Sequence, residues 1–202
     1  MGRPLQPLIS VESLITAALE LVDETGDFSF PKLAKRIGVS QSSIYNHVTG
    51  RDEILELLRH RIITEVPYAA VDHSDWEGSL RILIRAYRDA FARHPRLAPL
   101  MVLQSVRDPA VIGLYEDLAV ALETAGFKGR DVTAAISTID SFALGAALDL
   151  AAPEVVWDPP SEGYPTLKRA LGHAGPTSER ANFAFDFGLD VIIGGLKARL
   201  AR

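Results

Sequence analysis

Hydrophobic residues recur every three or four positions along almost the whole chain, whereas no stretch alternates with the period of two that is typical of β-strands. The first such run lies between Ser10, a good N-cap residue, and Gly26, which tolerates the left-handed backbone that ends many helices. The residues expected on its buried face are Leu14, Ile15, Ala18, Leu21 and Val22. The pattern predicts an all-α protein.

Two short helices are predicted next, joined by a tight turn at residues 38–40. Ser29 and Pro31 mark the start of the first, because serine caps a helix and proline fits its first turn. Ser40 caps the second, and residues 49–50 interrupt it. The residues expected on the buried sides of these helices are Leu33, Ala34, Ile37, Ile44 and Val48.

Longer helical runs occupy the rest of the chain, apart from a proline-rich loop at 152–165. We predict a small N-terminal domain at 1–49 and a larger helical bundle at 50–202. The first helix of the larger domain, 51–66, links the two. All the helices predicted after residue 50 are 51–66, 77–93, 97–106, 109–125, 131–151, 167–171 and 178–200.

The composition is that of a folded domain, since 48% of the 202 residues are hydrophobic and can form a sizeable core. Cysteine is absent, which excludes disulfides and thiolate metal sites. No apolar run approaches the roughly 18 residues of a membrane helix, and Met1–Ser10 lacks the pattern of a signal peptide. We therefore expect a cytoplasmic protein that has no membrane partner.

The charges are unevenly distributed. Residues 1–27 carry a net charge of −4, residues 28–51 carry +4 with no acidic residue, and residues 52–202 carry −5. A basic segment in an acidic chain indicates a small electropositive surface that faces a polyanion. A solvated charged surface without a partner is the alternative.

This basic segment contains a helix, a tight turn and a second helix, which is the arrangement of a helix-turn-helix DNA-binding motif. Ala34 is small where the two helices approach each other, and Gly38 permits the sharp turn. An ordinary αα-hairpin is the alternative. The second helix carries no acidic side chain, however, so nothing on it would repel phosphate. The front of that helix carries Gln41, Ser42, Ser43, Tyr45 and Asn46.

The stretch FPKLAKRIGVSQSSIYNHVTGRDEIL resembles the DNA-binding domain of TetR-family transcriptional repressors. The C-terminal stretches DWEGSLR, ALETAGFKGRDVTAAISTIDSFALGAALDLA and FAFDFGLDVIIGGLKARL are similar to the ligand-binding core of the tetracycline repressor subgroup. This resemblance covers nearly the whole chain. It implies a homodimer that binds a palindromic, double-stranded operator and is released by a small effector.

The resemblance also implies roles for individual residues. Gln41 and Asn46 offer a donor and an acceptor together, which suits adenine, and Lys32 and Arg51 would anchor phosphates. Pro31 occupies a position where the subgroup often has a base-reading arginine, so we expect a different operator. The residues expected at the DNA are Ser29, Lys32, Gln41, Ser42, Ser43, Tyr45, Asn46, His47 and Arg51.

The helices at 131–151 and 178–200 are expected to form the dimer interface, because small residues at helical spacing allow close helix–helix approach. Packing within one chain is the alternative. The small residues concerned are Ala134, Ala135, Gly145, Ala146, Ala147, Gly188, Gly194 and Gly195.

The bundle interior is expected to enclose a pocket for a mostly hydrophobic effector. A magnesium–tetracycline complex is disfavoured, because Met101 stands where the subgroup has its metal-binding histidine. We expect no metal and no cofactor. The residues predicted to line the pocket are Tyr87, Met101, Gln104, Phe142 and Asp149, and its apolar walls are Leu83, Leu100, Val102, Leu103, Phe142 and Leu144.

An enzymatic function is disfavoured, and we identify no catalytic residue. The chain lacks the G-x-S-x-G, G-x-G-x-x-G, P-loop and H-E-x-x-H motifs, and its histidines never lie three or four residues apart. An architectural DNA-binding protein without an effector is the second alternative. It would have a well-filled C-terminal bundle and a weak sequence preference.

Overall fold

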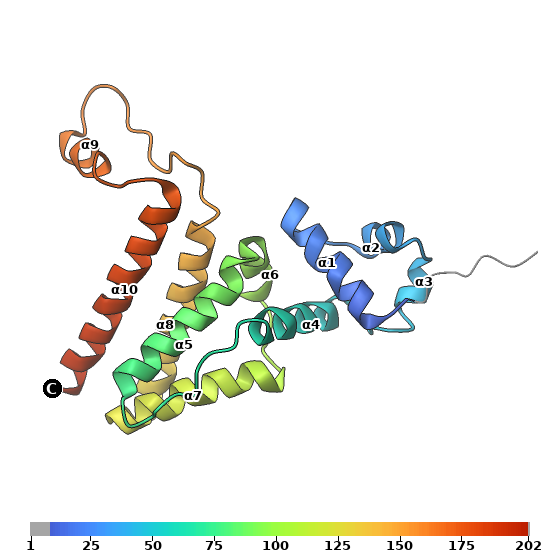
Figure 1. The fold of residues 1–202 in the computed structure, drawn as a ribbon, viewed down its shortest axis with the longest axis horizontal. Helices are drawn as coiled ribbons and strands as arrows, with labels where there is room; N and C mark the ends of the chain where they lie inside the picture. Colours follow the sequence, from blue (N-terminus) through green and yellow to red (C-terminus); the bar gives the residue numbers. More distant parts are fainter. Residues whose placement is uncertain (1–8, 202) are drawn as a thin grey trace, which may run out of the picture.

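The computed structural model describes residues 9–201, and every regular element in that range is a helix (Figure 1). The predicted all-α fold is confirmed. Residues 1–8 and 202 lie outside the described residues, as does most of the Met1–Ser10 stretch considered above. The helices are α1 (Val11–Thr25), α2 (Phe30–Ile37), α3 (Gln41–Ile44), α4 (Arg51–Thr64), α5 (Trp76–Ala92), the 3₁₀ helix η1 (Pro95–Leu97), α6 (Ala98–Met101), α7 (Pro109–Ala125), α8 (Arg130–Asp149), α9 (Pro165–Leu171) and α10 (Thr177–Leu200).

Helices α1, α2 and α3 form a small unit at one end of the molecule (Figure 1). Ser10 and Ser13 form a reciprocal capping box at the start of α1, and Gly26 ends this helix with a φ of 80°. Gly38 has a φ of 78° and makes the turn between α2 and α3. The apolar faces of all three helices are buried together, as the sequence predicts.

Two details of this unit differ from the prediction. Ser29 occupies the N-cap position of α2, but its side chain makes no capping hydrogen bond. Helix α3 ends at Ile44, and residues 45–47 form a turn. The prediction of a longer helix there was wrong, although Ile44 and Val48 are both buried as expected.

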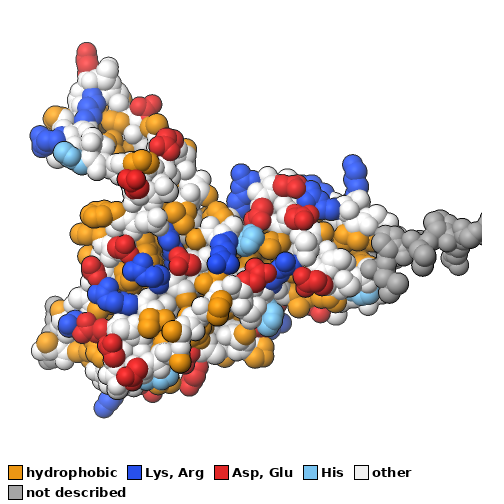
Figure 2. Space-filling view, in the orientation of Figure 1, with side chains coloured by type: hydrophobic (Ala, Val, Ile, Leu, Met, Phe, Trp, Pro, Cys, Tyr) orange, Lys and Arg blue, Asp and Glu red, His pale blue; other side chains and the backbone are white. Residues whose placement is uncertain are grey.

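The larger unit is built around α5, which packs against both α7 and α8. Helix α10 packs on α8, and α4 connects the small unit to α5, α6 and α7. Helix α9 and the loop before it extend away from this bundle (Figures 1 and 2), and α9 has no buried residue. The protein therefore consists of a small three-helix unit, a packed bundle and a projecting segment.

The segment after α5 departs from the predicted helix at 97–106. It forms η1 and the short α6, leaves helical conformation after Met101, and resumes at α7. Asp108 caps α7 by accepting hydrogen bonds from the backbone N–H groups of Ala110 and Val111. The prediction was wrong because the hydrophobic residues Val102, Leu103 and Val106 belong to a connecting loop.

Helix α8 has a mean hydropathy of 1.2 over 18 residues, so by length and composition alone it is apolar enough to cross a membrane. This property was not predicted from the sequence. A core helix has the same composition, and α8 packs against α5, α7 and α10. We therefore interpret α8 as a helix of the bundle, with a third of this apolar window buried.

Candidate nucleic-acid interface

The surface of α3 that the sequence predicts to face DNA is open to solvent. Gln41 and Ser42 are exposed, Ser43 is half-buried, and Ile44 is buried beneath them. The hydroxyl oxygen of Ser40 lies 2.8 Å from the hydroxyl oxygens of both Ser42 and Ser43. The two serine hydroxyls are thus held by the helix cap, whereas the Gln41 amide is available to a ligand.

The turn after α3 carries an aromatic pair. The ring of Tyr45 stacks on that of Phe30 with their centroids 4.7 Å apart and an angle of 4° between the planes. Tyr45 and Asn46 are exposed, whereas His47 is half-buried. Phe30 therefore fixes the direction of the Tyr45 ring at the surface. No role for Phe30 was predicted from the sequence, because its partner lies 15 residues further along the chain.

Arg36 is not available to an anion. Its guanidinium pairs with Glu20 and Glu24 of α1, and the hydrogen bond to Glu24 raises the pKa of Arg36. Lys32 and Lys35 are exposed, and within residues 9–201 neither forms an ion pair. The positive charge of the basic segment is thus concentrated on these two lysines of α2.

Arg51, at the start of α4, is held by the loop before α2. Its Nη2 lies 2.6 Å from Oδ1 of Asp27, and its Nη1 donates to the carbonyl oxygen of Phe28 over 2.7 Å. Its guanidinium also lies over the Phe28 ring, 4.4 Å from the centroid. Burial raises the pKa of Asp27, but hydrogen bonds from Arg51 and from the Phe28 backbone outweigh it and lower that pKa. Arg51 fastens α4 to this loop, a contact that the sequence did not reveal.

The five residues predicted to line an effector pocket do not come together. Tyr87 and Met101 are buried in the bundle core. Phe142 and Asp149 line a groove of about 390 Å³ between α8 and α10. Gln104 lines a separate polar cavity of about 750 Å³ between the start of α4 and the loop before α7. The structure thus does not bring these five residues into one pocket.

The predicted apolar walls are also only partly buried. Leu83 and Leu144 are buried, whereas Val102 is 61% exposed and Leu103 is 86% exposed. The assignment of Val102 and Leu103 to the walls was wrong, because both lie beyond the end of α6. Leu100 and Phe142 pack on the edge of the core.

A polar cluster inside the bundle went unnoticed in the sequence. The hydroxyls of Tyr87 and Tyr115 both donate to Oδ1 of Asp140, over 2.9 and 2.6 Å, and lie 3.2 Å from each other. Burial raises the pKa of both tyrosines, so they remain protonated donors. The three residues come from α5, α7 and α8, and no sequence spacing connects them.

Residues 69–200 match the family model described as tetracyclin repressor-like, C-terminal domain. The chain belongs to the TetR family of transcriptional regulators. It is 30% identical to the tetracycline repressor protein class A of transposon 1721 from Escherichia coli over an alignment of 209 positions. This alignment covers 93% of this chain and 90% of the repressor. It spans only 64% and 55% of the lengths of two other curated relatives, an HTH-type transcriptional regulator of Saccharopolyspora erythraea and the repressor DrrR1 of Streptomyces coeruleorubidus.

Solved structures of TetR-family proteins share this fold. ActR of Streptomyces coelicolor in complex with actinorhodin matches with a TM-score of 0.74 and 22% identity, covering 95% of this chain and 97% of ActR. BioQ with its double-stranded DNA operator matches with a TM-score of 0.68 and 23% identity, covering 94% of this chain and 99% of BioQ. At such identities the likeness concerns the fold.

The pairing of the basic residues predicts how salt affects DNA binding by this TetR-family protein. Lys32→Ala is expected to flatten the slope of log K against log salt by roughly one unit, because an exposed lysine that neutralises a phosphate releases about one counterion. Arg51→Ala is expected to lower affinity with a smaller change of slope, because Asp27 already neutralises Arg51. Fluorescence anisotropy on a labelled duplex at several salt concentrations measures both. A slope that falls by a full unit in Arg51→Ala and stays unchanged in Lys32→Ala would show that Arg51, and not Lys32, contacts the phosphate.

Proposed function

We propose that this protein is a transcriptional repressor that binds a palindromic operator as a homodimer and is released by a small, mostly hydrophobic effector. We assign DNA binding to residues 1–49 and effector binding and dimerisation to residues 50–202. Because it acts on DNA, we propose a cytoplasmic location. The observation that carries the proposal is an exposed, acid-free surface on the second helix of a helix-turn-helix unit.

Direct base reading is supported by the exposure of Gln41 and Asn46. Both carry an amide, which pairs with adenine through one donor and one acceptor in the major groove. Tyr45 and Lys32 flank them and are suited to phosphate contacts. A half-site read by so short a helix binds weakly, so two copies are needed for a specific complex.

Dimerisation is supported by an apolar stripe on α10. Phe183, Phe187 and Val191 are spaced by four residues and are 75%, 64% and 56% exposed. An apolar stripe of this kind is typical of a protein–protein interface. Of the small residues predicted there, Ala135 and Ala147 are instead buried within one chain, whereas Gly145 and Gly194 are exposed.

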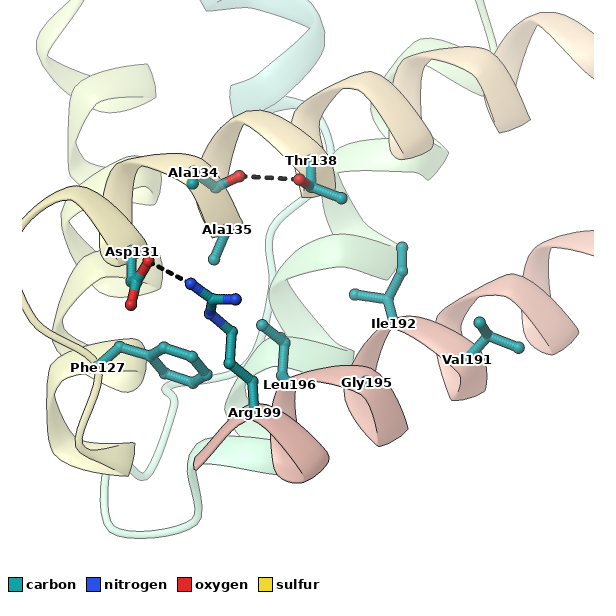
Figure 3. A pocket seen from close by; sticks show the side chains of 10 residues that line it. All are labelled: Phe127, Asp131, Ala134, Ala135, Thr138, Val191, Ile192, Gly195, Leu196 and Arg199. Atoms are coloured by element: carbon teal, nitrogen blue, oxygen red, sulfur yellow. Dashed lines mark hydrogen bonds and ion pairs between the residues drawn. The ribbon is translucent and has the colours of Figure 1, made fainter. Parts of the chain in front are cut away.

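The same surface is hollowed between α8 and α10. A groove of about 370 Å³ lies there (Figure 3), with the apolar side chains of Phe127, Ile192 and Leu196 on its walls. Arg199 crosses its end and pairs with Asp131 over 2.8 Å. A second copy related by a two-fold axis would place its own α8 and α10 against this groove.

Release from the operator follows from a shift of population. An effector that binds only the conformer with wrongly spaced recognition helices favours that conformer. A coupling free energy of about 1–3 kcal/mol is typical, which corresponds to a 5- to 150-fold loss of operator affinity. Of the predicted walls, Leu83 and Leu144 are buried and Leu100 and Phe142 pack on the core, and such apolar side chains suit a hydrophobic or aromatic molecule.

Selection of a duplex from a random pool, followed by binding measurements, tests the proposal. Gln41→Ala and Asn46→Ala are each expected to cost about 1–3 kcal/mol on the selected duplex and little on random DNA. Ser74→Ala, in the loop before α5, is the control and is expected to change neither. Equal losses on both DNAs would assign the residue to backbone contact, and failure to select a palindrome would favour an architectural DNA-binding protein.

A further inference from the structure

The C-terminal end of α1 carries acidic side chains at the pole of the helix where cations are favoured. Asp23 and Glu24 lie in the last turn, which contains no basic residue, and Asp27 follows two residues after the helix. The last carbonyl oxygens of a helix already form the negative end of its dipole. The compensating positive charge therefore comes from other elements.

These cations are supplied from both sides of the molecule. Arg36 of α2 and Arg51 of α4 pair with two of the acidic side chains. Asp23 instead takes its partner from the bundle, because Nδ1 of His94 lies 2.8 Å from Oδ2 of Asp23. His94 directly precedes η1 and is separated from Asp23 by 71 positions in the chain.

Arg96 of η1 holds the backbone at the same end of α1. Its Nη1 donates to the carbonyl oxygens of Asp23 and Glu24, over 2.9 and 2.6 Å. Both oxygens belong to the last turn of α1, where the helix has no N–H groups of its own left to donate. The bundle thus supplies hydrogen bonds that α1 cannot supply itself.

The segment that carries these two side chains is anchored in the bundle. Pro95 lies between them and restricts the backbone, since its ring fixes φ. Leu97 and Ala98, which follow, are 0% and 1% exposed, and η1 packs against α5, α6 and α8 as well as α1. The small unit formed by α1, α2 and α3 is therefore attached to the bundle at η1 in addition to α4.

We propose that Arg96, together with His94, is a positioning residue that fixes the orientation of the small unit for operator binding. A unit attached through one helix can rotate about that helix, and a second attachment removes this freedom. The apolar faces of α1, α2 and α3 are buried together, so holding α1 also holds the predicted recognition helix α3. This inference rests on the proposed function, because only a dimer on a palindrome requires two recognition helices at a fixed spacing.

Arg96→Met tests the inference on three duplexes: the selected palindrome, the same palindrome with one added base pair between the half-sites, and a single half-site. Affinity for the palindrome is expected to fall about tenfold, because a smaller fraction of the copies has the competent orientation. The preference for the selected spacing over the longer one is expected to fall with it. Affinity for the half-site is expected to stay at the wild-type value, because one recognition helix needs no fixed partner. Fluorescence anisotropy measures all three.

Two variants of the same segment are the controls. Arg96→Lys keeps a cation that can donate to both carbonyl oxygens, and it is expected to restore most of the affinity and the spacing preference. Arg93→Met removes an exposed arginine that makes no side-chain hydrogen bond or ion pair within residues 9–201, and it is expected to behave as wild type. Unchanged binding in Arg96→Met would overturn the inference. An equal loss on the half-site would also overturn it, since Arg96 would then contact DNA directly or support folding.

A distance measurement separates this inference from the proposed function. The chain has no cysteine, so spin labels at Lys35→Cys on α2 and Glu116→Cys on α7 are unique, and both positions are exposed. Labelled chains are mixed with an excess of unlabelled chains, so that a dimer carries one labelled pair. Double electron–electron resonance is expected to show a broader distance distribution with Arg96→Met than with wild type or Arg93→Met. Equal widths would overturn the inference even if the palindrome is bound. A broader distribution in a protein that binds no palindrome would support the attachment at η1 and overturn the proposed function.

Discussion

Phe187→Glu is expected to convert the protein to a monomer and to abolish operator binding. Phe187 lies in the middle of the exposed stripe on α10, and a two-fold interface would bury it twice, once from each copy. Two carboxylates placed in an apolar contact without partners are expected to raise the dimer dissociation constant about 1000-fold, or about 4 kcal/mol. Sedimentation velocity measures the assembly, and anisotropy on the selected duplex measures the binding.

Ile112→Glu is the matched control for this substitution. Ile112 is also an exposed apolar side chain, 46% accessible, but it lies on α7 and away from the stripe. The control is expected to stay dimeric and to bind operator normally. An intact Phe187→Glu dimer would place the interface elsewhere, and a Phe187→Glu monomer that binds the operator at wild-type affinity would show that dimerisation is unnecessary for recognition.

Most of the fold could be predicted from the sequence, because local signals mark the helix ends. Ser10, Gly26 and Gly38 act where the sequence places them, and the apolar spacing between them identifies the buried faces. The prediction failed at residues 97–106, where hydrophobic residues continue beyond the end of α6. Hydrophobic periodicity cannot tell a helix from an apolar loop that lies on the surface.

The candidate site was predictable only where its residues lie close together in the sequence. The helix-turn-helix surface is contiguous in sequence, so the exposure of Gln41 and Asn46 on the front of the second helix could be predicted from spacing. The restraint of Arg51 by Asp27 and the position of Asp140 depend on contacts between distant segments. Such contacts follow from tertiary packing, which a single sequence does not reveal.

Helix α4 is held to the bundle by a buried hydrogen-bond network around Arg59. Arg59 donates to the carbonyl oxygens of Met101 and Ser105, over 3.0 and 3.4 Å, and pairs with Glu56. Glu56 in turn accepts hydrogen bonds from the backbone N–H groups of Arg107 and Asp108, at the end of the loop directly before α7. Helix α4 is thus tied to both ends of the loop between α6 and α7.

Arg59→Met is expected to lower the free energy of unfolding by about 3 kcal/mol, because removal of one partner from a buried charged network leaves Oε1 of Glu56 and the carbonyl oxygen of Ser105 without a donor. Arg61→Met is the control on the same helix. Arg61 pairs with Glu65 and with Glu12 of α1 nearer the surface, where loss of a pair costs under about 1 kcal/mol. Urea denaturation followed by circular dichroism, at a fixed protein concentration because the proposed dimer unfolds with it, measures both variants. An Arg59→Met protein within about 1 kcal/mol of the control would mean that water replaces the guanidinium, and that the link between α4 and the bundle depends on apolar packing.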